Sequence, residues 1–145
     1  MIIYITDLNL NEKYYNQIIE LYSHFTNFDK QIFNLNKLNT IVQNLNNNHN
    51  ILLYIEDDNI IGAITLIIEQ KLIHNGGKVG HIEDFIVKEE HQKKNIGSLL
   101  LNHIKFLCQQ NNCYKIILDC DLLLENYYIK HNFTKKGNYM ALYLK

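Results

Sequence analysis

Two neighbouring carboxylates, Glu83 and Asp84, stand inside an otherwise apolar segment that is typical of a β-strand. A short basic turn with Lys93 and Lys94 follows, and an amphipathic helix then begins near Ile96. The first turn of a helix offers free backbone N–H groups and about half a positive charge from the helix dipole. The spacing therefore predicts a phosphate site directly beside a pair of acids that could transfer protons.

Asp119 is a third candidate acid. It follows Ile116-Ile117-Leu118, a pattern typical of a buried parallel strand, in which a carboxylate is unexpected. Side chains alternate along a strand, so we expect only one of Glu83 and Asp84 to face a given side. The alternative is that both simply end a strand near solvent. Adjacent carboxylates among apolar neighbours are costly without partners, and this cost favours a functional role for the pair.

Apolar periodicity indicates the elements that must position these acids. We expect strands at residues 2–6, 51–55, 60–68, 78–87, 114–120 and 139–144, and helices near 14–25, 35–45, 96–108 and 124–130. The polar run at residues 56–59 predicts a hairpin turn. This order predicts an α/β (α+β) fold with a mixed sheet and helices on both faces, as a single domain over residues 1–145.

Composition narrows the classes of partner. The formal net charge of −1 provides no basic field for nucleic acid. No apolar run reaches the roughly 18 residues of a membrane span, and the N-terminus lacks the basic region of a signal peptide. Three cysteines without Cys-x-x-Cys spacing favour reduced thiols and a cytoplasmic location. The histidines show no ligand grouping with Cys or carboxylates, so we expect no metal.

The order of elements resembles the GCN5-related N-acetyltransferase (GNAT) superfamily. Within it, three segments are similar to the glucosamine 6-phosphate N-acetyltransferases: Gly80-His81-Ile82-Glu83-Asp84, Cys113 to Asp121, and Lys71-Leu72-Ile73-His74. The resemblance implies a mostly antiparallel sheet of about seven strands. It departs at Asn95, where the family usually has a glycine, at Leu124 and at Tyr143. Asn tolerates positive φ better than most residues, so we expect Asn95 to adopt it.

The resemblance also implies an activity: acetyl transfer from acetyl-CoA to the 2-amino group of D-glucosamine 6-phosphate, directly within a ternary complex. The product would feed UDP-N-acetylglucosamine biosynthesis. By match to the family, Asp119 positions and helps to deprotonate the amine, Glu83 lines the sugar as a further catalytic group, and the hydroxyl of Tyr128 protonates the CoA thiolate. A core role is the alternative for Tyr128, since the chain has ten tyrosines.

Binding residues follow from the same resemblance. The backbone of Phe85, Ile86 and Val87 would pair with the pantetheine arm, and the CoA pyrophosphate would lie on Gln92, Lys93, Lys94, Asn95, Ile96, Gly97 and Ser98. A solvated basic turn is the alternative for the lysines. Substrate-side positions are Thr26, Lys71, His74, Glu83, Asp84, Phe85, Tyr114 and Lys115. The chain has no arginine, so Lys115 from a neighbouring subunit would complete the phosphate site of a homodimer.

Two other functions remain open from the sequence. The same fold could acetylate a different amine, such as a peptide N-terminus or a polyamine. A non-catalytic acyl-CoA-binding module would explain Asn95 and Leu124, although Asp119 and Tyr128 favour an enzyme.

Overall fold

A five-stranded mixed sheet forms the centre of the molecule, and the computed structural model describes residues 1–144 of the chain. The strands lie in the order of the sequence, and all neighbours are antiparallel except β4 and β5. The elements are β1 (Ile2–Tyr4), α1 (Glu12–Tyr22), α2 (Leu35–Gln43), β2 (His49–Glu56), β3 (Asn59–Gln70), α3 (Ile73–Gly76), β4 (Lys78–Val87), α4 (Ile96–Gln110), β5 (Cys113–Ile117) and α5 (Glu125–Lys130). Short 3-10 turns lie at Ile5–Asp7, Glu89–His91 and Leu122–Leu124.

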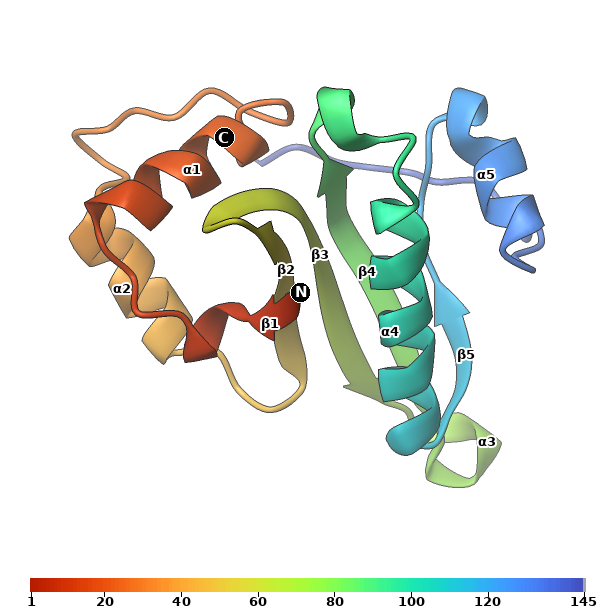
Figure 1. Cartoon of the computed structure of the whole chain (residues 1–145). Helices are drawn as coiled ribbons and strands as arrows, with labels where there is room; N and C mark the ends of the chain where they lie inside the picture. The colour runs from red at the N-terminus through yellow and green to blue at the C-terminus, as the bar shows by residue number, and fades with distance from the viewer. Residues whose placement is uncertain (145) are drawn as a thin grey trace.

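Helices cover the two faces of the sheet at different ends (Figure 1). α4 packs on β3 to β5 through a buried stripe at helical spacing: Ile96, Leu100, Ile104 and Cys108. α1 and α2 form a second apolar cluster over β1 to β3. β3 is buried on both faces between these clusters, and accordingly its sequence is almost continuously apolar from Ile60 to Leu66.

The expected hairpin is confirmed. β2 and β3 pair up to Glu56 opposite Asn59, and the two residues between them, Asp57 and Asp58, have φ of 48° and 63°. Positive φ at both central positions gives a turn whose twist matches that of the strands, and Asp tolerates this conformation.

The prediction of a C-terminal strand at residues 139–144 is wrong. The sheet has five strands, whereas about seven were expected. The segment is irregular, and its large side chains are 69% to 90% exposed. In Figure 1 it is an extended trace that runs from α5 toward the side of the molecule that carries α1. A strand that is apolar on both faces needs neighbours on both, and within residues 1–144 this segment has no strand partner.

Candidate active site

β4 and β5 separate part-way along their length, and this opens a site between them. Their parallel pairing begins at Lys78 beside Cys113 and ends at His81 beside Ile117. β4 continues to Val87 with β3 on its other side. The outer backbone edge of residues 82–87 therefore has no strand neighbour in the described chain, and an extended ligand could pair with it.

Asp84 interrupts the regular alternation of β4. Its φ of 46° is left-handed, and the register with β3 shifts between Ala63 and Thr65. A β-bulge of this kind re-aims the side chains beside it. Glu83 and Asp84 consequently both line one pocket, so the expectation that only one of them would face a given side is wrong.

The pocket between the diverging strands has a volume of about 270 Å³. It brings Glu83, Asp84 and Asp119 together with Tyr128 of α5. The three acidic residues are exposed, whereas Tyr128 is buried. The lining consists of Phe25, Ile82, Glu83, Asp84, Phe85, Leu118, Asp119, Cys120, Asp121, Leu124 and Tyr128.

Asp119 does not lie in a buried parallel strand, as its apolar neighbours suggested. β5 ends at Ile117, and Asp119 follows in an irregular, exposed segment. Because β5 has already left β4 at this point, the carboxylate meets the solvent of the pocket and carries no burial cost in a sheet.

The acids of the pocket act on one another electrostatically. The pKa of Glu83 is raised, first by partial burial and then by the negative charges of Asp84 and Asp119, while His81 opposes the shift. A carboxylate with a raised pKa is a better proton acceptor. Glu83 is therefore suited to act as a general base.

Tyr128 has a raised pKa for a different reason. Burial, reinforced by Cys120 and Tyr127, raises the pKa of its phenol to about 12. Edge-on contacts with the rings of Tyr127 and Phe133, at centroid distances of 5.3 and 5.8 Å, hold it in place. The hydroxyl is thus protonated near neutral pH and can act as a proton donor.

The start of α4 has the properties expected of an anion site. Asn95 has φ of 60°, which confirms the expected left-handed conformation, and its side chain does not cap the helix. The first turn contains no acidic residue. Its N–H groups are left for an outside acceptor, and the exposed Lys93 and Lys94 precede it. The Gln92 amide donates to the Val87 carbonyl at 3.3 Å and ties this turn to the end of β4.

The match with known sequences decides the family. Residues 12–133 match the Acetyltransferase (GNAT) family. The chain belongs to this family. The GNAT chain is also similar to curated relatives named glucosamine 6-phosphate N-acetyltransferase. It is 42% identical over 85 residues to one from Dictyostelium discoideum and 40% identical over 78 residues to one from Candida albicans.

These alignments cover 59% and 54% of the GNAT chain and 54% and 52% of the relatives, so the chain spans about half the length of these curated relatives. A solved glucosamine-6-phosphate N-acetyltransferase from Arabidopsis thaliana has the same fold. Its TM-score is 0.86 at 24% identity, with 100% of this chain and 99% of that chain covered. An aminoglycoside acetyltransferase from a soil metagenome also superposes, with a TM-score of 0.77 at 16% identity over 100% and 96% of the two chains.

Four predicted substrate residues of the GNAT chain lie away from the acidic pocket: Lys71, His74, Tyr114 and Lys115. They gather around α3 and the start of β5, where the rings of His74 and Tyr114 are 4.3 Å apart. Lys115 lies within β5, whereas Asp119 follows the end of that strand, four residues later. Lys71 is also paired, since its ammonium lies 2.6 Å from Glu69.

Thr26 is exposed in the loop after α1, and its hydroxyl contacts only the neighbouring Asn27 carbonyl, at 3.5 Å. Its neighbour Phe25 lines the pocket instead. Sequence reasoning missed Phe25, as well as Cys120 and Asp121. The acid repeat Asp119-Cys120-Asp121 was visible, but the aim of each side chain depends on where β5 ends.

Residues 1–144 contain no group of three or more His, Cys, Asp or Glu residues placed to hold a metal ion. No helix among them has both the length and the apolar character needed to cross a membrane.

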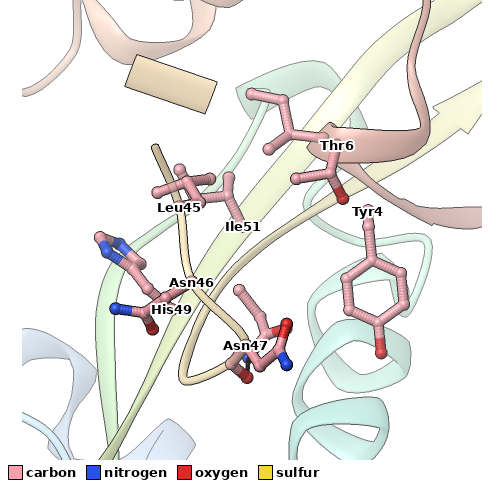
Figure 2. Close-up of a pocket in the computed structure, with 9 residues that line it drawn as sticks. Tyr4, Thr6, Leu45, Asn46, Asn47, His49 and Ile51 are labelled. Atoms are coloured by element: carbon pink, nitrogen blue, oxygen red, sulfur yellow. Dashed lines mark hydrogen bonds between the residues drawn. The ribbon is translucent and has the colours of Figure 1, made fainter. Parts of the chain in front are cut away.

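A smaller cavity of about 100 Å³ lies between β1, β2 and the loop after α2 (Figure 2). Asparagines, apolar residues and His49 line it, without a carboxylate or lysine. It offers no acid–base pair, and the acidic pocket between β4 and β5 remains the candidate active site.

Proposed function

We propose that this protein transfers the acetyl group of acetyl-CoA to the 2-amino group of D-glucosamine 6-phosphate. The observation that carries the proposal is the acidic pocket with Tyr128, whose lining residue Phe85 lies against Gly97 at the uncapped start of α4. GNAT acetyltransferases use acetyl-CoA as donor, and several curated relatives are named for this acceptor. The product would be N-acetylglucosamine 6-phosphate, used for UDP-N-acetylglucosamine.

The donor would lie along the free edge of β4. Backbone groups of residues 85–87 would pair with the amides of the pantetheine arm as a neighbouring strand does. The pyrophosphate would accept hydrogen bonds from the first turn of α4, with Lys93 and Lys94 adding long-range charge. A backbone N–H of β4 would stabilise the oxyanion, a contribution often worth about 3 kcal/mol.

The reaction needs two proton transfers, and the pocket holds a group for each. The amine attacks the thioester carbonyl, and its proton passes to Glu83 or Asp119, directly or through water. As the C–N bond forms and the C–S bond breaks, the departing thiolate takes the proton of the Tyr128 hydroxyl. The raised pKa of Glu83 and the neutral phenol of Tyr128 suit these roles.

The sugar phosphate would be bound by a second copy of the chain in a homodimer. Within one chain the basic residues Lys71, His74 and Lys115 stand apart from the acids. The exposed apolar residues at 139–144 would be covered in such a dimer. We place this activity in the cytoplasm, which the three free cysteines favour.

A second candidate acceptor follows from the charge of the pocket. Its lining contains the acids Glu83, Asp84, Asp119 and Asp121 but no lysine or histidine. Such a pocket would attract a polyamine or another polycationic amine and would repel a phosphate unless a partner subunit supplied cations. The chemistry would be the same on a different substrate.

Thiol release from acetyl-CoA, measured with a panel of acceptors, tests these proposals. The panel contains glucosamine 6-phosphate, glucosamine, spermidine and a peptide with a free N-terminus. We expect the highest kcat/KM for glucosamine 6-phosphate. A preference for spermidine would assign the second candidate, and CoA binding without turnover of any amine would indicate a binding module.

A further inference from the structure

Three side chains meet at the first turn of α4: Ser98, His131 and Tyr127. The proposed mechanism gives them no joint role. The Ser98 hydroxyl lies 3.2 Å from Nε2 of His131, just after α5. The ring of His131 lies 4.7 Å from that of Tyr127 on α5, measured between centroids. A chain of polar groups therefore joins the start of α4 to the end of α5.

The Tyr127 hydroxyl is unusual among the described residues because it is buried and has no hydrogen-bond partner. It points at Gly97, where an added Cβ would lie 2.8 Å from the hydroxyl oxygen. Burial raises the pKa of Tyr127, and the nearby Ser98 hydroxyl opposes this rise. A buried donor without a partner costs free energy, so its retention indicates a use outside the unliganded chain.

The surroundings favour a neutral His131 in the unliganded protein. Burial and the positive charge of Lys105 on α4 lower its pKa. Lys105 is held close because its ammonium donates to the His131 carbonyl at 2.7 Å. Ser98 and Tyr127 are the other polar groups that face the ring.

We propose that Tyr127, Ser98 and His131 form a hydrogen-bond relay in which His131 decides where the Ser98 hydroxyl donates. The inference rests on the proposed binding of CoA at α4. Ser98 would contact a phosphate, whereas His131 and Tyr127 are positioning residues that act through it.

The relay has two states. In the unliganded state His131 is neutral with its proton on Nδ1, so Ser98 donates to Nε2 and the Tyr127 hydroxyl is left without a partner. In the liganded state the Ser98 oxygen would also accept from Tyr127. With His131 protonated, Nε2–H donates to the Ser98 oxygen, and the Ser98 proton is released toward a phosphate at the first turn of α4. The imidazolium also adds a positive charge beside the anion. A bound phosphate therefore favours the protonated state and raises the pKa of His131 from its depressed value.

The sign of the pH dependence follows. CoA should bind more tightly as the pH falls through the titration of His131, and binding should take up a proton. We expect Kd to fall about tenfold between pH 8 and pH 5.5, the usual effect of one charge-assisted hydrogen bond. CoA has its own phosphate titration in this range, so the informative quantity is the difference between variants of the protein.

The experiment is calorimetric titration of CoA into the full chain between pH 5.5 and 8. His131→Gln keeps a hydrogen-bonding side chain but cannot titrate, so it should lose the part of the pH dependence due to the protein. Ser98→Ala should lose most of the same part, because only the positive charge of the imidazolium then still acts on the phosphate. Tyr127→Phe should weaken CoA binding several-fold. His103→Gln is the matched control, since His103 lies on α4 against Phe106 and outside the relay.

An unchanged pH dependence in His131→Gln would overturn the proposal. If the pH dependence is lost in His131→Gln but fully kept in Ser98→Ala, His131 acts on the phosphate through its charge alone, and the relay is overturned. NMR titration of His131 without ligand gives a test independent of CoA: Ser98→Ala should lower its pKa, because the imidazolium loses a charge-assisted acceptor that is stronger than the bond to the neutral ring. Normal CoA binding with none of these shifts refutes the relay alone, whereas absence of CoA binding by the unmodified chain refutes the proposed function.

Discussion

At the scale of single residues, repulsion between the carboxylates of Glu83 and Asp84 makes Glu83 a better base. Asp84 raises the pKa of Glu83 more than Asp119 does, and only burial acts more strongly. Of the two acceptors in the proposed mechanism, Glu83 has the raised pKa. With Glu83 as the base it must be ionised to accept a proton, so the acidic limb of the activity profile reports this pKa.

Asp84→Asn should therefore move the acidic limb of kcat/KM to lower pH. The substitution removes a negative charge that disfavours ionised Glu83, so its pKa falls back toward the ordinary value of 4.5. Activity is then retained at a pH where the unmodified protein has lost it. Initial rates between pH 4.5 and 8 measure the shift. Asp119→Asn should move the limb in the same direction, and a shift to higher pH would contradict the assignment.

Tyr128→Phe removes one hydroxyl with almost no change in volume. If the hydroxyl protonates the thiolate, turnover should fall by roughly 100- to 10,000-fold, which is typical of general-acid catalysis, while the fold persists. Single-turnover rates with acetyl-CoA measure the effect. Tyr14→Phe is the matched control, because Tyr14 bonds to Asp58 beside the β2–β3 hairpin. An unchanged turnover number would show that Tyr128 only packs in the core and does not donate the proton.

Some residue-level features were predictable and others were not, for a physical reason. The positive φ of Asn95 followed from a local property of the residue and its place in a turn. The left-handed Asp84 did not, because a bulge depends on the register of β4 against β3. Periodicity assumes a regular strand, so it placed the two acids on opposite sides.

At the scale of elements, α5 packs closely against α4 because residue 97 on α4 is a glycine. A Cβ at Gly97 would lie 2.8 Å from the Tyr127 hydroxyl and 3.4 Å from the Phe85 ring. The first distance is too short for any real contact, whereas the second is tight but close to normal. The hydroxyl of Tyr127 is therefore the main obstacle to a larger residue at this position.

Gly97→Ala should destabilise the protein by about 1–3 kcal/mol, the usual cost of overpacking. The same substitution in a Tyr127→Phe background should be neutral or stabilising, because the obstructing oxygen is gone and Ala favours a helix by up to about 1 kcal/mol over Gly. Urea denaturation of the four proteins of this double-mutant cycle measures the coupling. Additive effects would show that the hydroxyl is not the obstacle.

The elements themselves were predictable where their apolar pattern was complete. α1, α2, α4 and the β2–β3 hairpin follow from helical spacing and turn residues. The end of β5 did not, because apolar residues continue past Ile117 while the strand has already left β4. Leu118 lines the pocket, and an apolar residue in a pocket wall cannot be told from one in a buried strand by its type.

At the scale of the whole molecule, the acids and the candidate phosphate ligands stand at different ends of β4 and β5. Lys115 pairs with the start of β4 beside Val79, whereas Asp119 and Tyr128 lie at the far end. A two-fold dimer would bring the basic end of one chain to the acidic end of the other. The exposed apolar side chains of residues 139–144 in the single chain are the surface that such an association would cover.

Mixing two inactive variants tests this arrangement. In a heterodimer of a Lys115→Ala chain and a Tyr128→Phe chain, one shared site holds both intact residues and the other holds neither. Random mixing of equal amounts makes about half of the dimers mixed, so about a quarter of the unmodified activity should return. If each chain serves its own pocket, the mixture only averages its parents. Activity at that average, or a monomer in light scattering at assay concentration, would show that the phosphate site lies within a single chain.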